Sequence, residues 1–109
     1  MTRTAAELDA IARNNPFLRD AADPRTLHVV FLAERPGRSR AALLDPDSSP
    51  PDRFVLRGGE IYLLCRNGLA RSRLTAQYFD STLETTSTFR NWNTVLKMLE
   101  LARLPARSG

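Results

Sequence analysis

The sequence has little of the side-chain chemistry on which most enzymes depend. Its 109 residues include a single cysteine, Cys65, and a single histidine, His28. One cysteine allows no internal disulfide bond and no cysteine-rich metal cluster. The chain also lacks a Ser–His–Asp order, a Cys–His pair, the spacing of metal ligands and the glycine motifs that bind nucleotides. We therefore predict no catalytic residues, no metal site and no cofactor.

Long hydrophobic runs are also missing. A helix that spans a bilayer needs about 20 apolar residues, whereas the longest apolar runs here, around Leu27–Ala33 and Ile61–Cys65, have the length of strands. The N-terminus, MTRTAAELDA, has no apolar signal core. These absences predict a cytoplasmic protein without a membrane segment.

Lysine is nearly absent as well. The chain has fifteen arginines but one lysine, Lys97, and a net charge of +4. Nucleic-acid-binding proteins usually use both cations, so this bias is more typical of a GC-rich genome than of selection for phosphate contacts. The arginines are unevenly spread, however, because Arg53–Arg73 contains five of them and one acid, Glu60. This segment is predicted to form a local basic surface.

The residues that are present predict one α+β domain at 1–104 and a disordered tail at 105–109. The elements follow the order α-β-α-β-β-α-β-α, which favours a mixed β-sheet of about four strands covered by helices. The first helix is expected to begin at a capping box formed by Thr4 and Glu7 and to end before Pro16.

A strand and a loop follow this helix. Leu27–Ala33 is nearly all apolar, so we expect a central strand that is buried on both faces. His28 within it is more typical of a core or edge histidine than of a catalytic base. Ser39–Leu44 favours a short helix, and Asp45–Asp52, which holds three prolines and three aspartates, favours a rigid surface loop with solvated acids.

Two strand-forming segments joined by Gly58-Gly59 predict a hairpin in which both glycines take positive φ. Its strands are Arg53–Arg57 and Glu60–Cys65, with Arg57 opposite Glu60, Leu56 opposite Ile61, Val55 opposite Tyr62 and Phe54 opposite Leu63. Cys65 then shares the core face with alternate apolar residues of both strands. We expect its thiol to be buried and unreactive.

Three elements are predicted after the hairpin. A helix over Leu69–Phe79 begins just after an Asn-Gly turn, a strand covers Glu84–Phe89, and a last helix runs from about Asn91 to Arg103. Trp92 begins an apolar row on this last helix.

Four segments together resemble one family: LHVVFL at 27–32, the loop of serines, prolines and aspartates at 47–52, NGLARSRLT at 67–75 and TFRNWNTVLKMLELA at 88–102. They are similar to a bacterial family, the domain of unknown function 1697, over about Arg3–Ala102, and the chain looks like the C-terminal half of that family. Leu64–Arg66 departs from an aromatic–proline pair found in many relatives. The resemblance implies an α+β fold with a mixed sheet and supplies no catalytic assignment.

Family members of this kind carry a further N-terminal domain and a strand before the first helix. Neither is seen ahead of Thr4. The resemblance therefore puts in doubt any function that requires a site formed between the N-terminal and C-terminal halves of the family. It also predicts an unpaired sheet edge beside Leu27–Ala33 or an adjoining strand. Such an edge readily pairs with another chain, which makes a homodimer through a sheet edge one expected assembly.

The first candidate ligand site consists of Asn67, Gly68, Arg71, Ser72 and Arg73. A glycine turn before a helix presents free main-chain N–H groups and the positive end of the helix dipole to an anion. The alternative is structural: Asn67 and Gly68 form a turn, Asn67 or Ser72 caps the helix, and the arginines are surface charge.

The second candidate consists of Arg90, Asn91 and Asn93 around Trp92. Arginine, tryptophan and two amides together favour stacking and hydrogen bonding with a base or a sugar. In the alternative interpretation, Asn91 or Asn93 caps the last helix and Trp92 anchors its buried face, which leaves Arg90 as the contact residue.

These observations leave three functional classes. The first is a non-catalytic domain that binds a phosphate-bearing ligand or nucleic acid through a basic surface formed by the hairpin and a helix. The alternative is a structural module that self-associates, and an enzyme is the least supported. Convergent arginines favour the first, an open apolar edge the second, and a deep pocket with a shifted pKa the third.

Overall fold

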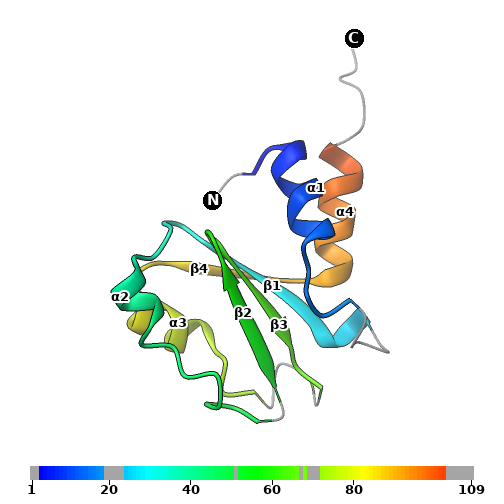
Figure 1. Ribbon diagram of the computed structural model, residues 1–109. Coiled ribbons are helices and arrows are strands. Elements are labelled where there is room, and N and C mark those ends of the chain that lie inside the picture. Colours follow the sequence, from blue (N-terminus) through cyan, green and yellow to red (C-terminus); the bar gives the residue numbers. More distant parts are fainter. Residues whose placement is uncertain (1–2, 19–23, 51, 67, 69–71, 103–109) are drawn as a thin grey trace.

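The computed structural model describes residues 3–18, 24–50, 52–66, 68 and 72–102, so the tail predicted at 105–109 lies outside the described residues. Its elements confirm the α+β class and the predicted order (Figure 1). They are α1 (Ala5–Arg13), a 3-10 turn (Pro24–Thr26), β1 (Leu27–Leu32), α2 (Arg38–Ala41), β2 (Arg53–Arg57), β3 (Glu60–Leu64), α3 (Ala76–Leu83), β4 (Ser87–Asn91) and α4 (Trp92–Ala102). Within the described parts, no helix has the length and apolar character that crossing a bilayer requires.

The four strands form one sheet in the order β2-β3-β1-β4, and every neighbouring pair is antiparallel. The prediction of a mixed sheet is therefore wrong. Strands β1 and β2 run the same way, but β3 lies between them; β3 and β4 also run the same way, but β1 lies between them. Strands of equal direction thus never become neighbours, which is the split βαβ topology of ferredoxin-like folds.

This strand order also moves the edges of the sheet. Strand β1 pairs with β3 on one side and with β4 on the other, so the unpaired edge does not lie beside Leu27–Ala33 itself; of the two expected positions, only an adjoining strand remains. The edges are β2 and β4 instead.

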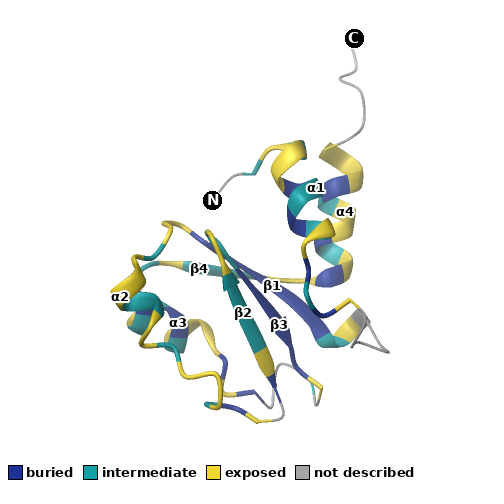
Figure 2. Ribbon diagram, in the orientation of Figure 1, coloured by how far each residue is buried: buried dark blue, intermediate teal, exposed yellow. Residues whose placement is uncertain are grey.

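A helical layer covers each face of the sheet, so the protein has two apolar clusters. Helices α1 and α4 pack on one face and α2 and α3 lie over the other (Figure 1). All six residues of β1 are buried, which confirms the expectation for this strand (Figure 2). Successive side chains of β1 pack on opposite faces of the sheet. Val29 and Phe31 pack with α1 and α4, and Val30 and Leu32 pack with α3.

The hairpin has the predicted register, including Arg57 opposite Glu60 and Phe54 opposite Leu63. Of its two turn glycines, however, only Gly58 takes a positive φ, at 61°. A positive φ at the first turn position alone is the requirement of a type II′ turn, so the expectation for Gly59 is wrong.

Local capping sets the helix ends. The predicted capping box is present, with the Thr4 hydroxyl accepting from Glu7 N and the Glu7 carboxylate accepting from Thr4 N. The third helix does not begin after Gly68 but at Ala76, because the Thr75 hydroxyl caps it by accepting from Tyr78 N at 3.2 Å. It ends at Glu84, which adopts the left-handed conformation, and the following strand therefore starts later than predicted.

Candidate functional site

The first predicted site is not assembled as expected. Asn67 and Arg71 lie outside the described residues. Gly68 has a positive φ of 89°, as a turn glycine requires. Among the described residues that follow it, the first helix N-terminus is at Thr75, seven positions further along the chain. The described residues therefore do not place a helix N-terminus next to this glycine.

Ser72 belongs instead to a buried polar cluster. The Ser49 hydroxyl donates to the Asp52 carboxylate at 2.9 Å and accepts from Arg73 N at 2.9 Å. The Ser72 hydroxyl lies 3.5 Å from that of Ser49 and accepts from Leu74 N at 3.0 Å. This cluster ties the loop before β2 to the segment before α3. The sequence predicted a surface loop with solvated acids such as Asp45 and Asp47, whereas Ser49 and Asp52 of the same loop are each more than nine-tenths buried.

Cys65 lies beside this cluster and is fully buried, as predicted. Burial raises the pKa of its thiol to about 11, a hydrogen bond with Ser72 opposes that rise, and the charge of Asp52 adds to it. The thiolate that would act as a nucleophile is therefore scarce near neutral pH. The side chain contributes packing.

We expect Cys65 to react with an aromatic disulfide reagent at pH 8 at least about 100-fold more slowly in the native protein than in urea. A rise of about two pKa units lowers the thiolate fraction by about that factor, and burial adds to it. Absorbance of the released thiolate measures both rates, with Cys65→Ser as the blank. Native labelling within about tenfold of the unfolded rate would contradict a buried thiol.

The second predicted site serves the structure. The side-chain Oδ1 of Asn91 accepts from Thr94 N at 2.8 Å and so caps α4. Trp92 is buried in the cluster between α4 and the sheet. Arg90 is exposed at the edge strand and donates to the Phe89 carbonyl, and Asn93 is exposed on the first turn of α4. Asn91 and Trp92 therefore have the structural roles of the alternative interpretation, in which the amide caps α4 and the indole anchors its buried face.

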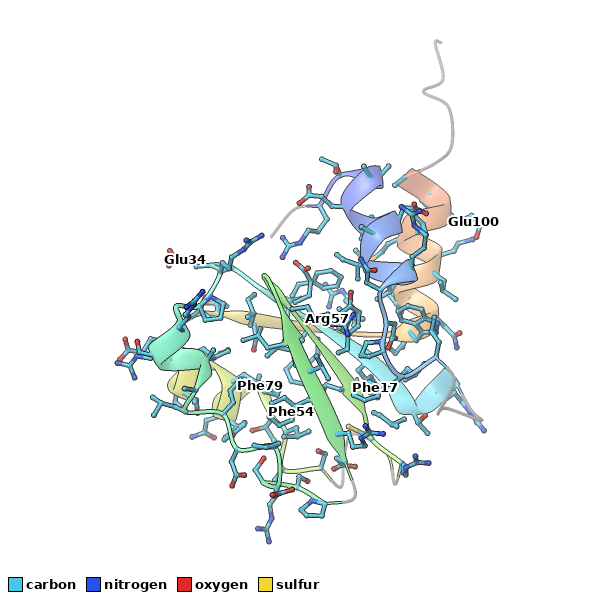
Figure 3. The ribbon with its side chains drawn as sticks, viewed as in Figure 1. Phe17, Glu34, Phe54, Arg57, Phe79 and Glu100 are labelled. Atoms are coloured by element: carbon cyan, nitrogen blue, oxygen red, sulfur yellow. The ribbon has the colours of Figure 1, made fainter. Side chains whose placement is uncertain are left out.

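A pocket that neither prediction included lies between α1 and the hairpin. Its volume is about 290 Å³, and α1 supplies its apolar wall. Figure 3 shows Arg57 on the side of the hairpin that faces α1. The polar side chains that line the pocket are Glu7, Asn14, Arg35, Arg57, Glu60 and Tyr62.

Both acids of this pocket are already engaged. Glu60 accepts from Arg3 at 3.0 Å and 2.9 Å, and the same guanidinium lies 3.4 Å from the carbonyl oxygens of Leu32 and Gly59. Glu7 is held by its capping box, and the hydrogen bond from Thr4 N lowers the pKa of its carboxyl group. Neither carboxylate needs a further cation.

The two arginines of the pocket have no such partner. Arg57 donates to the main-chain carbonyl of Asn14 at 2.8 Å and forms no ion pair with a described residue. Arg35 forms neither a hydrogen bond nor an ion pair within the described residues, and its guanidinium lies against Gly58. With Arg3 counted, three arginines face two carboxylates, so the pocket has a net positive charge of one, and neither Arg35 nor Arg57 forms an ion pair with a described residue.

Tyr62 forms the floor of the pocket and is not an acid–base group. Its hydroxyl donates to the Ile11 carbonyl at 2.9 Å. Burial raises its pKa to about 12, Glu60 adds to the rise and Arg57 opposes it. The phenol stays protonated and holds α1 against the sheet.

The sequence indicated Arg57 as part of a basic hairpin but gave no sign of Arg35. No local motif connects the two, because Arg35 comes after β1 whereas Arg57 is the last residue of β2. The order of the elements could have indicated that they lie close together. Arg35 comes shortly after the C-terminal end of β1, and the hairpin turn that follows Arg57 lies at that same end of the sheet.

Comparison with known proteins gives one match. Residues 1–62 match the family described as “Protein of unknown function (DUF1697)”. No curated protein and no solved structure matches the chain. All the residues that line the pocket fall within the matched segment, and both of the sites predicted from the sequence fall beyond it.

Proposed function

We propose that this chain, which belongs to the family of proteins of unknown function DUF1697, binds a small anionic ligand in the pocket between α1 and the hairpin turn. One observation carries the proposal: the carboxylates of the pocket are engaged, whereas Arg35 and Arg57 have no acidic partner among the described residues. The domain acts by binding, without catalysis. The anion site thus moves from Asn67–Arg73 to the opposite end of the hairpin.

The chemistry of the two guanidinium groups suits a carboxylate or a phosphate. Each presents five N–H donors in a planar fork, and Arg57 uses one of them on Asn14. Two forks that are free of carboxylates can bind the oxygens of one anion with charge-assisted hydrogen bonds.

The size of the pocket favours a small molecule over a polymer. Its volume of about 290 Å³ is at the lower end of the range for ligand pockets. Binding of a nucleic-acid backbone needs a row of phosphate contacts, which supply most of its affinity. Two arginines in one concavity supply a single such contact. Nucleic acid is therefore the less favoured ligand.

Titration with inorganic phosphate and with citrate at about 20 mM salt, where charge screening is weak, tests the proposal. We expect the amide resonances of Gly58 and Gly59 to shift, and Arg35→Gln or Arg57→Gln to weaken binding about tenfold, since a hydrogen bond to a charged group contributes about 1.5–3 kcal/mol. Arg38→Gln is the matched control, because it removes the same charge from α2 outside the pocket.

Two results would count against this pocket. If Arg38→Gln and Arg57→Gln weaken anion binding equally, the loss of affinity comes from the change in net charge and not from a contact in the pocket. If Arg73→Gln or Arg90→Gln weakens anion binding while Arg35→Gln leaves it unchanged, the anion binds at the residues predicted from the sequence.

A further inference from the structure

The two edges of the sheet differ in how their main-chain groups are occupied. Thr86 points its carbonyl toward Ala33, so by alternation Ser87 and Phe89 of β4 point theirs away from the sheet. Ser87 N–H donates to the Asp80 carboxylate at 2.8 Å, and the Phe89 carbonyl accepts from the Arg90 guanidinium at 3.0 Å. Side chains of the protein itself thus occupy one outward main-chain group of Ser87 and one of Phe89 on the β4 edge.

The β2 edge has no such cover. Arg57 and Glu60 close the two-residue turn as a hydrogen-bonded pair, so Phe54 and Leu56 point their N–H and C=O groups outward. No described residue forms a hydrogen bond with these groups on that side. Figure 1 shows β2 as the outermost strand, with β3 as its neighbour.

We infer that β2 pairs with an extended, acidic segment of a partner protein, which adds a strand to the sheet. The main-chain groups of Phe54 and Leu56 supply the hydrogen bonds, as in other cases of strand addition. Charge selects the partner: Arg53 and Arg57 are exposed at the two ends of β2 and share a face. They lie about 13 Å apart, four residues along an extended strand. The Arg53 guanidinium lies over the Phe17 ring at 5.2 Å, a contact that leaves its charge at the surface.

The side chains of β2 define the sequence that fits. Acidic residues four apart would lie opposite Arg53 and Arg57. The three residues between them would meet Phe54, Val55 and Leu56, which are only partly buried and favour β-branched neighbours. A second pocket of about 300 Å³ lies at the start of the edge and is lined by Pro46, Asp47, Pro50, Asp52, Arg53 and Phe54. Its two acids favour an uncharged flanking side chain there, so the acidic residues of the partner are confined to the positions opposite Arg53 and Arg57.

A second copy of this chain fits the edge less well. Antiparallel pairing of two β2 strands about Val55 places Arg53 opposite Arg57 of the other copy. Like charges directly opposite each other destabilise a strand pair. Moving the register to separate them loses hydrogen bonds at Phe54 or Leu56. The acidic partner satisfies both the charges and the hydrogen bonds.

The test uses three capped peptides: Glu-Val-Thr-Val-Glu, the same peptide with lysine at both ends, and the acidic peptide N-methylated at its bonding amides. At about 1 mM, the acidic peptide is expected to slow hydrogen exchange at Phe54 and Leu56 at least about tenfold. The lysine and N-methylated peptides are expected to leave exchange unchanged.

Two variants separate charge from hydrogen bonding. Arg53→Glu lies outside the anion pocket. It is expected to weaken binding of the acidic peptide and to strengthen binding of the lysine peptide. Leu56→Pro removes an outward N–H at an edge where proline is tolerated, and is expected to abolish peptide binding while phosphate still shifts Gly58.

Three outcomes would overturn the inference. The first is equal protection by the acidic and lysine peptides. The second is no protection by any peptide while native circular dichroism and phosphate binding persist. The third is a dimer mass in sedimentation equilibrium with Phe54 and Leu56 already protected, which would assign the edge to a second copy. Arg57 belongs to both sites, but hydrogen exchange at Phe54 and Leu56 reports on the edge, whereas phosphate-induced shifts at Gly58 and Gly59 report on the pocket. Arg35→Gln, which changes the pocket alone, is expected to leave peptide protection unchanged, so failure of one proposal can be told from failure of the other.

Discussion

Replacing Phe79 with alanine is expected to lower the free energy of unfolding by about 3–5 kcal/mol, the usual loss for a fully buried aromatic residue. Phe79 is wholly inaccessible to solvent and joins α3 to the sheet. Its ring lies 5.8 Å from that of Phe54, 5.3 Å from that of Tyr78 and 6.0 Å from that of Phe89 (Figure 3). Such aromatic pairs add to the apolar area that is buried.

The loss is large because α3 cannot close the cavity. The helix has only eight residues, and Leu83 is its other buried anchor. Urea denaturation followed by circular dichroism measures the change, with Leu96→Ala as control, because Leu96 is 41% exposed on α4. We expect the control to lose less than about 1 kcal/mol. A similar loss for both variants would show that α3 is not anchored through Phe79.

The parts of the fold that could be predicted depend on residues close in sequence. The capping box at Thr4 requires only a partner three residues away, and the hairpin register follows from a two-residue turn between alternating strands. The burial of Leu27–Leu32 follows from a continuous apolar run, and that of Cys65 follows from the alternation along the hairpin. In each case the physical cause lies within a short window of sequence.

Competing local signals explain the misplaced helix. Ser72 and Thr75 both offer a hydroxyl to cap a helix, and the sequence alone does not rank them. In the structure Ser72 is engaged by Leu74 N and by the hydroxyl of Ser49, a contact across the fold. Thr75 is therefore left to cap α3, and the helix start moves away from Gly68.

The strand order and the pocket could not be predicted because distant segments create them. Strand β1 becomes central only when both split βαβ units form, and no property of Leu27–Ala33 specifies which strands flank it. The pocket likewise combines Arg35, Arg57 and Glu60 from separate segments. Arg3 forms the ion pair that keeps Glu60 from pairing with these arginines. Nothing in the sequence distinguishes it from the other fourteen arginines.

The role of Arg3 gives the second large effect. Arg3→Met is expected to lower the free energy of unfolding by about 2–3 kcal/mol, since Arg3 is mostly buried and its removal leaves Glu60 without its partner. Methionine keeps much of the aliphatic volume near Phe31, over which the guanidinium lies at 5.4 Å. Urea denaturation measures this loss and shows that the variant still folds.

Arg3→Met is also expected to weaken phosphate binding about 5- to 10-fold, although Arg3 does not line the pocket. The freed carboxylate of Glu60 stands opposite Arg57 in the hairpin, so it would pair with that guanidinium and repel an anion. The double variant Arg3→Met/Glu60→Gln removes the charge and is expected to recover wild-type affinity. Glu60→Gln alone leaves Arg3 as an extra cation and is expected to bind phosphate more tightly than the wild type. Unchanged affinity in Arg3→Met, or no recovery in the double variant, would show that the charge of Glu60 does not govern the pocket.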